Sequence, residues 1–104
     1  MYTALLVYTR MNVVGGESAE LRCNTSLTAD VMWTYDANNS GIVDYVYWNG
    51  HTDVARPRLS VKSIKGGFHS LVIADVQLKD EGLYDCYDDT GSRKVGYQFS
   101  TDGI

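Results

Sequence analysis

The run Asp80-Glu81-Gly82-Leu83-Tyr84-Asp85-Cys86 decides how this chain folds. In its second half, Tyr84 and Cys86 alternate with Leu83 and Asp85. Successive side chains of a β-strand point to opposite faces of the sheet, so the run predicts a strand with Tyr84 and Cys86 turned inward. Gly82 suits the place where the chain turns tightly into that strand.

The same period of two recurs along the rest of the chain. The inward positions of the other predicted strands are Ala19, Leu21 and Cys23; Val31, Trp33 and Tyr35; Leu59 and Val61; Leu71 and Ile73; and Val95, Tyr97 and Phe99. Turn-forming residues separate these strands. Short, evenly spaced strands predict an all-β sandwich or barrel, and the length of 104 residues predicts one domain over residues 1–104. At most one helical turn is expected, near Gln77 to Asp80.

Composition and motifs argue against several functions. The net charge is −4, so a nucleic-acid partner, which needs a basic face, is not expected. No apolar run approaches the roughly 20 residues of a membrane span, and residues 4–7 read as part of a strand, so membrane insertion is not expected. We find no cofactor motif and no nucleophile motif, and the acidic residues fall on strand faces and turns where they stay solvated. Neither an enzyme nor a bound cofactor is therefore predicted.

Two cysteines, Cys23 and Cys86, lie far apart in the chain, and neither belongs to a Cys-x-x-Cys motif. With His51 and His69 they are too few and too scattered for a metal site. The histidines are expected to be a surface polar group and an edge-packing residue, respectively. For the cysteines two interpretations remain: buried thiols in a reducing compartment, or one disulfide in an oxidising compartment.

Cys23, Trp33 ten positions later, and the run 80–86 together resemble the immunoglobulin superfamily, whose D-x-G-x-Y-x-C motif the run contains. The resemblance covers about Val14 to Phe99. It implies an all-β, two-sheet Greek-key sandwich of the variable (V-set) type, because the stretch from Trp33 to Cys86 leaves room for strands C′, C″, D, E and F. Within that stretch, residues 42–48 read as C′, and Asn49-Gly50 reads as the turn into a short C″.

The resemblance also implies roles for single residues. Cys23 and Cys86 would form a disulfide between the two sheets. Tyr84 takes the tyrosine-corner position, so its hydroxyl would bond the backbone just upstream. Arg58 would form an ion pair with Asp80 at the lower end of the sandwich. The expected core residues are Trp33, Tyr84, Leu71 and Ile73.

Two departures argue against antibody-like pairing of chains. Trp33-Thr34-Tyr35-Asp36 lacks the glutamine-bearing strand of antigen receptors, and residues 97–103 lack their F-G-x-G motif. The sequence is more similar to stand-alone variable domains. These include the junctional adhesion and coxsackie-adenovirus receptor group, the butyrophilin-like ligands, and variable-type receptors of invertebrate chordates. The resemblance implies an extracellular module that recognises a protein.

In this family the outward face of strands G, F, C and C′ is the usual docking surface. The alternation places on it either Tyr45 with Tyr47 or Val46 with Trp48 from C′. Either pair would give the face exposed aromatic or apolar bulk, typical of an interface with another protein or a second copy of this chain. The other predicted contact residues are Thr34, Asp36, Asp85, Tyr87 and Gln98.

Two alternative functions remain open. One is ligand binding through the loops at residues 24–29, 49–53 and 88–93, with Asp88, Asp89 and Arg93 as contacts. The other is a structural spacer in a longer receptor, which would show a polar, glycosylated face. Near the last loop an acidic cluster is expected that would steer a basic partner, formed by Asp36, Asp44, Asp85, Asp88 and Asp89. No loop has EF-hand spacing, so no calcium site is predicted.

Two glycosylation sequons, Asn24-Thr25-Ser26 and Asn38-Asn39-Ser40, are each a hint of secretion. Asn24 is expected on the sheet opposite the docking surface, where a glycan leaves that surface open. Asn38 is expected at the rim, where a glycan would crowd it.

Overall fold

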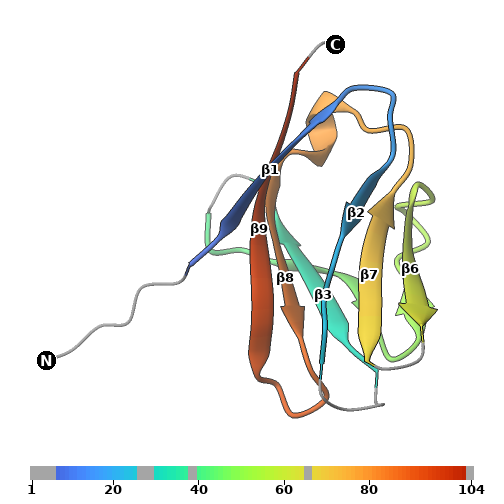
Figure 1. Cartoon of the computed structure of the whole chain (residues 1–104), viewed down its shortest axis with the longest axis vertical. Coiled ribbons are helices and arrows are strands. Elements are labelled where there is room, and N and C mark those ends of the chain that lie inside the picture. The colour runs from blue at the N-terminus through green and yellow to red at the C-terminus, as the bar shows by residue number, and fades with distance from the viewer. Residues whose placement is uncertain (1–6, 26–29, 38–39, 65–66, 103–104) are drawn as a thin grey trace, which may run out of the picture.

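A computed structural model of the chain describes residues 7–25, 30–37, 40–64 and 67–102. Figure 1 shows two layers of strands packed face to face. Most of the segment expected to be a strand at residues 4–7 lies outside the described residues. The elements are β1 (Thr9–Val14), β2 (Ala19–Leu21), β3 (Met32–Asp36), β4 (Asp44–Trp48), β5 (His51–Thr52), β6 (Leu59–Ile64), β7 (Phe68–Ile73), the 3-10 turn η1 (Leu78–Asp80), β8 (Gly82–Tyr87) and β9 (Arg93–Asp102).

The strands form two sheets. A six-stranded sheet has the order β1-β9-β8-β3-β4-β5, and a three-stranded sheet has the order β2-β7-β6. The predicted two-sheet sandwich is therefore confirmed, with β3, β4, β8 and β9 corresponding to strands C, C′, F and G of the family. β1 pairs in parallel with β9, from Thr9 opposite Tyr97 to Val14 opposite Asp102. β1 was not among the predicted strands, and its residues Met11 and Val13 are only partly buried.

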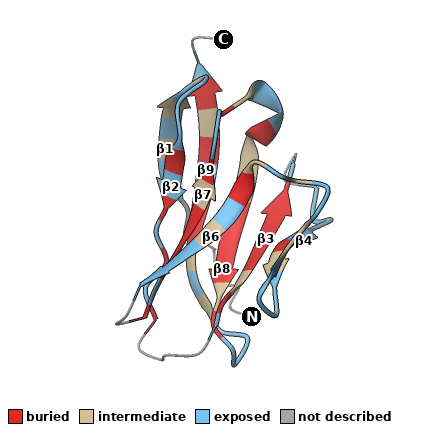
Figure 2. Cartoon of the chain, turned by 90° about the vertical axis from the view of Figure 1, so that its right-hand side faces the viewer, coloured by how far each residue is buried: buried red, intermediate tan, exposed pale blue. Residues whose placement is uncertain are grey.

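The core lies between the sheets, as Figure 2 shows by the buried residues on β3, β7, β8 and β9. The predicted disulfide is present: Cys23 and Cys86 are bonded to each other. Trp33 stacks on Tyr97 with a centroid separation of 6.3 Å. The four residues expected in the core are each at most 2% exposed: Trp33, Tyr84, Leu71 and Ile73.

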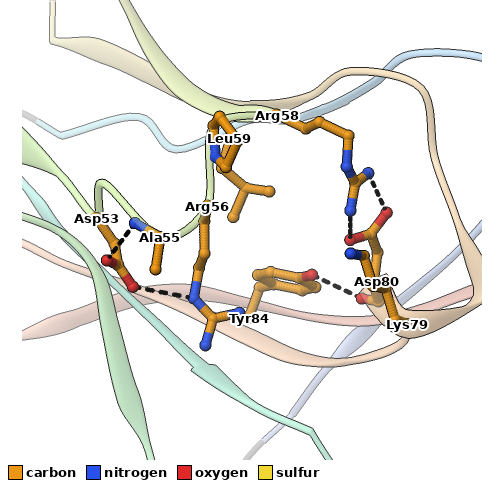
Figure 3. Close-up of a pocket in the computed structure, with 9 residues that line it drawn as sticks. Asp53, Ala55, Arg56, Arg58, Leu59, Lys79, Asp80 and Tyr84 are labelled. Carbon is orange, nitrogen blue, oxygen red and sulfur yellow. Dashed lines mark hydrogen bonds and ion pairs between the residues drawn. The ribbon is translucent and has the colours of Figure 1, made fainter.

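The end of the sandwich next to η1 is closed by the predicted ion pair and tyrosine corner (Figure 3). Both terminal nitrogens of Arg58 donate to the Asp80 carboxylate, each at 2.7 Å. The Tyr84 hydroxyl donates to the Asp80 carbonyl oxygen at 2.6 Å. The nearby Arg56 is also engaged, donating to Asp53 at 3.2 Å and to Asp44 at 2.8 Å. Four of the charged residues that line the hollow drawn in Figure 3, Asp53, Arg56, Arg58 and Asp80, therefore already have partners within the chain.

Candidate protein-docking face

Strand pairing aligns residues in rows across the outer face of the six-stranded sheet. The middle row runs from Gly96 through Asp85 and Thr34 to Tyr45. One step toward η1, Gln98 lies opposite Leu83, and Leu83 lies opposite Asp36. One step toward the β8–β9 turn, Tyr87 lies opposite Met32 and Arg93. Gln98 is exposed, and Tyr87 is half-buried.

An irregularity in the pairing of β3 with β4 decides which C′ side chains face out. Tyr45 pairs with Thr34, but Tyr47 pairs with Trp33, so Val46 is an additional residue in β4. Such a bulge breaks the period of two. Val46 is fully buried, whereas Tyr45 is 58% exposed and Trp48 is 60% exposed.

Both pairs expected for C′ are therefore wrong, because the bulge mixes them. Tyr45 and Trp48 face out, while Val46 and Tyr47 pack against the core. The Tyr47 hydroxyl donates to the Asp30 carboxylate at 2.8 Å. Burial, and then this hydrogen bond, raise the pKa of Tyr47 to about 12. Tyr47 is consequently bonded to Asp30, and its ring packs against the core.

Two further exposed apolar residues lie in the segment before β4. Ile42 is 77% exposed and Val43 is 47% exposed. Together with Tyr45 and Trp48 they form what we call the docking strip. The sequence interpretation missed Ile42 and Val43, although two apolar residues directly after the Gly41 turn are a signal that could have found them.

Trp48 also borders a hollow at the loop end of the face. The Asn49-Gly50 turn joins β4 to β5 as predicted, with positive φ at both residues, and it holds Trp48 opposite His51. The hollow has a volume of about 450 Å³, and its lining residues are Asp30, Val31, Met32, Trp48, Asn49, Asp88, Asp89 and Gly91. Trp48 and the carboxylates of Asp30, Asp88 and Asp89 therefore line the same hollow.

The carboxylates around the hollow differ in how they are bound. Asp88 accepts a hydrogen bond from the Thr90 hydroxyl at 2.6 Å and from the Ser92 amide at 3.0 Å, and Lys94 lies 3.4 Å away. The bond from Thr90 is the main cause that lowers the pKa of Asp88 to about 2. Asp89 is exposed and forms no ion pair with any described residue. Asp89 is thus the carboxylate best placed to meet a cation of a partner.

Three residues expected to be open on this face are covered. Thr34, Asp36 and Asp85 are at most 7% exposed, so the expectation that they touch a partner is wrong for this conformation. Asp36 accepts hydrogen bonds from the amides of Ser40 and Gly41, both at 2.9 Å. It therefore holds the turn that precedes the docking strip.

Asp85 is covered because Gly96, its neighbour on β9, has no side chain and leaves room for other side chains above the sheet. A Cβ at Gly96 would collide with Asp85, Arg93 and Tyr8, which fill the space above it. Arg93 donates to Asp85 at 2.6 Å and lies 4.7 Å from the centroid of the Tyr8 ring. The Tyr8 hydroxyl donates to Asp85 at 3.1 Å. Arg93, predicted as a loop contact, is therefore largely engaged within the chain.

The predicted acidic cluster is not one group but is spread along the face, with Asp85 in the middle row. Asp36 pairs with Leu83 near the start of β8, far from the β8–β9 turn that follows the end of that strand. Asp44 forms an ion pair with Arg56. The acidic group at the loop end consists of Asp88, Asp89 and Asp30, and the sequence interpretation did not include Asp30.

Of the remaining predicted residues, Asn24 and His69 lie on the side of the three-stranded sheet. Asn24 is exposed and lies opposite Phe68 of the three-stranded sheet. Asn38 lies outside the described residues, as do residues 26–29 of the first predicted binding loop. His69 is buried, with Nδ1 2.9 Å from the Ser63 hydroxyl, and His51 is exposed.

Within the described residues, no group of three His, Cys, Asp or Glu side chains is placed to hold a metal ion. Within the same residues, no helix is long and apolar enough to cross a membrane.

Comparisons with known proteins agree with the fold. Residues 7–102 match the family model of the immunoglobulin V-set domain. A search of curated proteins finds no match. Among solved structures, the chain is similar to a ZIG-8–RIG-5 IG1–IG1 heterodimer, with a TM-score of 0.72, 19% identity, and coverage of 93% of this chain and 84% of that one. It is also similar to Dpr1 IG1 bound to DIP-eta IG1, with a TM-score of 0.73, 20% identity, and coverage of 98% and 96%.

Proposed function

The chain belongs to the immunoglobulin V-set family, and we propose that it is an extracellular recognition module that docks a second protein through its docking strip. V-set domains of this kind act in protein recognition, and the Cys23–Cys86 disulfide suits an oxidising compartment outside the cell. The partner we propose is another immunoglobulin-type domain, from the same or a different chain.

The observation that carries this proposal is the clustering of exposed apolar side chains. Among the described residues, the large exposed apolar side chains include Ile42, Val43, Tyr45 and Trp48, all within one short stretch of chain. Contiguous apolar patches with polar rims mark interaction sites, and Trp and Tyr are enriched among the residues that dominate binding energy. A spacer domain gains nothing from keeping a tryptophan exposed on its sheet face.

The acidic residues beside Trp48 indicate the chemistry of the partner. An exposed tryptophan next to Asp89 and Asp30 fits an arginine or lysine, whose cation can lie on the ring while it pairs with a carboxylate. Exposed charge pairs are screened by salt, so association is expected to weaken as ionic strength rises.

The similar solved structures support the choice of partner class. Each contains two immunoglobulin domains bound to one another. Their identity to this chain is 19% and 20%, so they support the fold and the kind of assembly but carry no residue assignments.

The test is a set of matched variants examined in two binding experiments. Sedimentation velocity across a concentration series measures self-association, and surface plasmon resonance against a panel of purified variable-type ectodomains measures binding to other chains. Tyr45→Ala and Trp48→Ala are compared with Leu78→Ala, because Leu78 is 61% exposed but lies in η1, outside the strip. Loss of a central aromatic residue is expected to cost at least about 2 kcal/mol, or about 30-fold in affinity.

The outcomes separate the proposal from its rivals. A dimer or a complex that Trp48→Ala weakens, and Leu78→Ala does not, supports docking through the strip. A complex that responds only to Asp88→Ala or Asp89→Ala supports loop binding instead. A monomer without any binder in the panel contradicts the proposal and favours the spacer.

A further inference from the structure

A second exposed apolar group lies on the opposite side of the molecule. Phe68 of β7 is 45% exposed, and Ile64 of β6, its direct cross-strand neighbour, is 54% exposed. Phe68 is bridged on its other side to Asn24. Asn24, Phe68 and Ile64 therefore form one row across the end of the three-stranded sheet.

All three side chains of this row lie on the outer face. The neighbours of Asn24, Cys23 and Thr25, are 1% and 4% exposed, so the Asn24 side chain between them points outward. His69, next to Phe68, is 7% exposed, which turns Phe68 outward by the same alternation. Asn24 is exposed, and its amide forms no hydrogen bond with another described residue.

The backbone bonds bring Asn24 and Phe68 especially close. The Thr25 amide donates to the Gly67 carbonyl at 2.7 Å, and the His69 amide donates to the Cys23 carbonyl at 2.8 Å. These bonds flank the Asn24–Phe68 pair on both sides. Asn24 and Phe68 are therefore a non-hydrogen-bonded pair of the antiparallel ladder. In such pairs the Cα atoms lie about 4.5 Å apart, and side chains meet most closely.

The surroundings of the row are polar. Arg22 and Lys62 have side chains that are 82% and 59% exposed, and both approach the Glu20 carboxylate. An exposed phenylalanine and isoleucine on such a face leave apolar area in water, at about 25 cal/mol per Å². Among the described residues, Asn24 is the direct neighbour of Phe68 in this row, so a group attached to Asn24 would lie beside both apolar side chains.

We infer that Asn24 carries an N-linked glycan whose first N-acetylglucosamine packs against Phe68 and Ile64. Asn24-Thr25-Ser26 is an acceptor sequon, although Ser26 lies outside the described residues. A pyranose ring has an apolar face of C–H groups that covers an aromatic ring well, and burial of that area stabilises the contact. The glycan lies on the sheet opposite the docking strip and leaves the strip open. The inference rests on the extracellular location of the proposed function but not on docking.

The first experiment asks whether Asn24 is modified. The chain is secreted from cultured animal cells behind an added leader, and its intact mass is measured before and after peptide-N-glycosidase F. The expected result is a glycan on the wild type and on Asn38→Gln that is absent from Asn24→Gln. A secreted wild type that is unmodified at Asn24, including one modified only at Asn38, overturns the inference.

The second experiment tests the packing. An endoglycosidase trims the glycan to one N-acetylglucosamine, and NMR records the shifts of its ring protons. A sugar lying on the Phe68 ring is expected to show upfield ring-current shifts that Phe68→Leu abolishes and Val54→Leu retains; Val54 is 95% exposed and lies outside the row. Unshifted sugar protons, or shifts that survive Phe68→Leu, contradict the packing. Neither experiment depends on a binding partner, so failure of the docking proposal would leave both results unchanged.

Discussion

Replacing Asp80 with asparagine tests the Arg58–Asp80 ion pair at the η1 end of the sandwich. The Asp80 carboxylate is 5% exposed and accepts three hydrogen bonds of 2.7 Å, two from Arg58 and one from the Gln77 amide. Asp80→Asn keeps the shape of the side chain, but it removes the negative charge and one acceptor oxygen. The Arg58 guanidinium then stays partly buried without its counter-charge.

The expected cost follows from the burial of the two partners. Removing one member of a fully buried pair costs about 3–5 kcal/mol. Arg58 has a side chain that is 21% exposed, so water compensates part of the loss. We therefore expect the free energy of unfolding at neutral pH to fall by about 2–4 kcal/mol.

The pH dependence of this cost has a definite sign. Burial alone would raise the pKa of Asp80, but the hydrogen bonds from Arg58 and Gln77 and the charge of Arg58 outweigh it and lower the pKa. A lowered folded-state pKa contributes stability above the unfolded-state value of about 3.9, and that stability is lost as pH falls through the folded-state pKa. The wild type and Asp80→Asn should therefore converge in acid.

Urea denaturation at neutral pH and again in strong acid measures both effects. The matched control is Asp44→Asn, whose partner Arg56 is 2.8 Å away but whose side chain is 62% exposed. An exposed pair of this kind contributes less than about 1 kcal/mol. Equal costs for the two variants at neutral pH, or a cost for Asp80→Asn that persists undiminished in acid, would refute the reasoning.

Three further outcomes are expected. Replacing Cys86 and its disulfide partner by alanine should lower the free energy of unfolding by about 2–5 kcal/mol in chemical denaturation, and thiol titration of the native wild type should detect no reactive cysteine. Gly82→Ala should destabilise the fold, because φ at Gly82 is +148° and backbone strain there costs roughly 1–3 kcal/mol. The new Cβ would also lie 2.5 Å from the Asp36 carbonyl oxygen, so the total cost should be larger, and thermal unfolding measures it. Carboxyl NMR titration should find the Asp88 carboxylate ionised down to a pH of about 2, and Thr90→Ala should raise the pKa of Asp88. Because the folded-state pKa is lowered, the ionised Asp88 stabilises the folded turn above the unfolded-state pKa. This stabilisation is lost only as pH falls below the unfolded-state pKa toward about 2. A pKa of Asp88 that Thr90→Ala leaves unchanged would contradict the assignment.

The sequence predicted the sandwich well because its determinants are local or recur in a fixed motif. Strand alternation located the inward faces of most strands. The resemblance then supplied the Cys23–Cys86 pairing and the Arg58–Asp80 ion pair, both of which the structure contains. The Asn49-Gly50 turn was readable because positive φ at two successive residues favours that pair of residue types.

Alternation could not predict in the same way which site residues are exposed on the outer face of the sheet. One additional residue, Val46, reverses the parity of β4 and brings Tyr45 and Trp48 to the same side. Alternation carries no sign of a bulge, because the additional residue is recognised only from the pairing with the neighbouring strand. Asp85 is covered by Tyr8, which lies 77 positions away in sequence and reaches it only through the parallel pairing of β1 with β9. A contact between residues so far apart in the chain leaves no pattern in the local sequence.

The most direct test of docking through the strip uses the two tryptophans. Trp33 is 0% exposed and Trp48 is 60% exposed, so acrylamide should quench Trp48 almost alone. The quenching constant is measured along the self-association series, or with a bound ectodomain from the panel, and Trp48→Phe identifies the signal. Our account predicts that quenching falls in proportion to the complex formed, because Trp48 leaves water. A complex that forms while Trp48 stays fully quenchable would contradict the account.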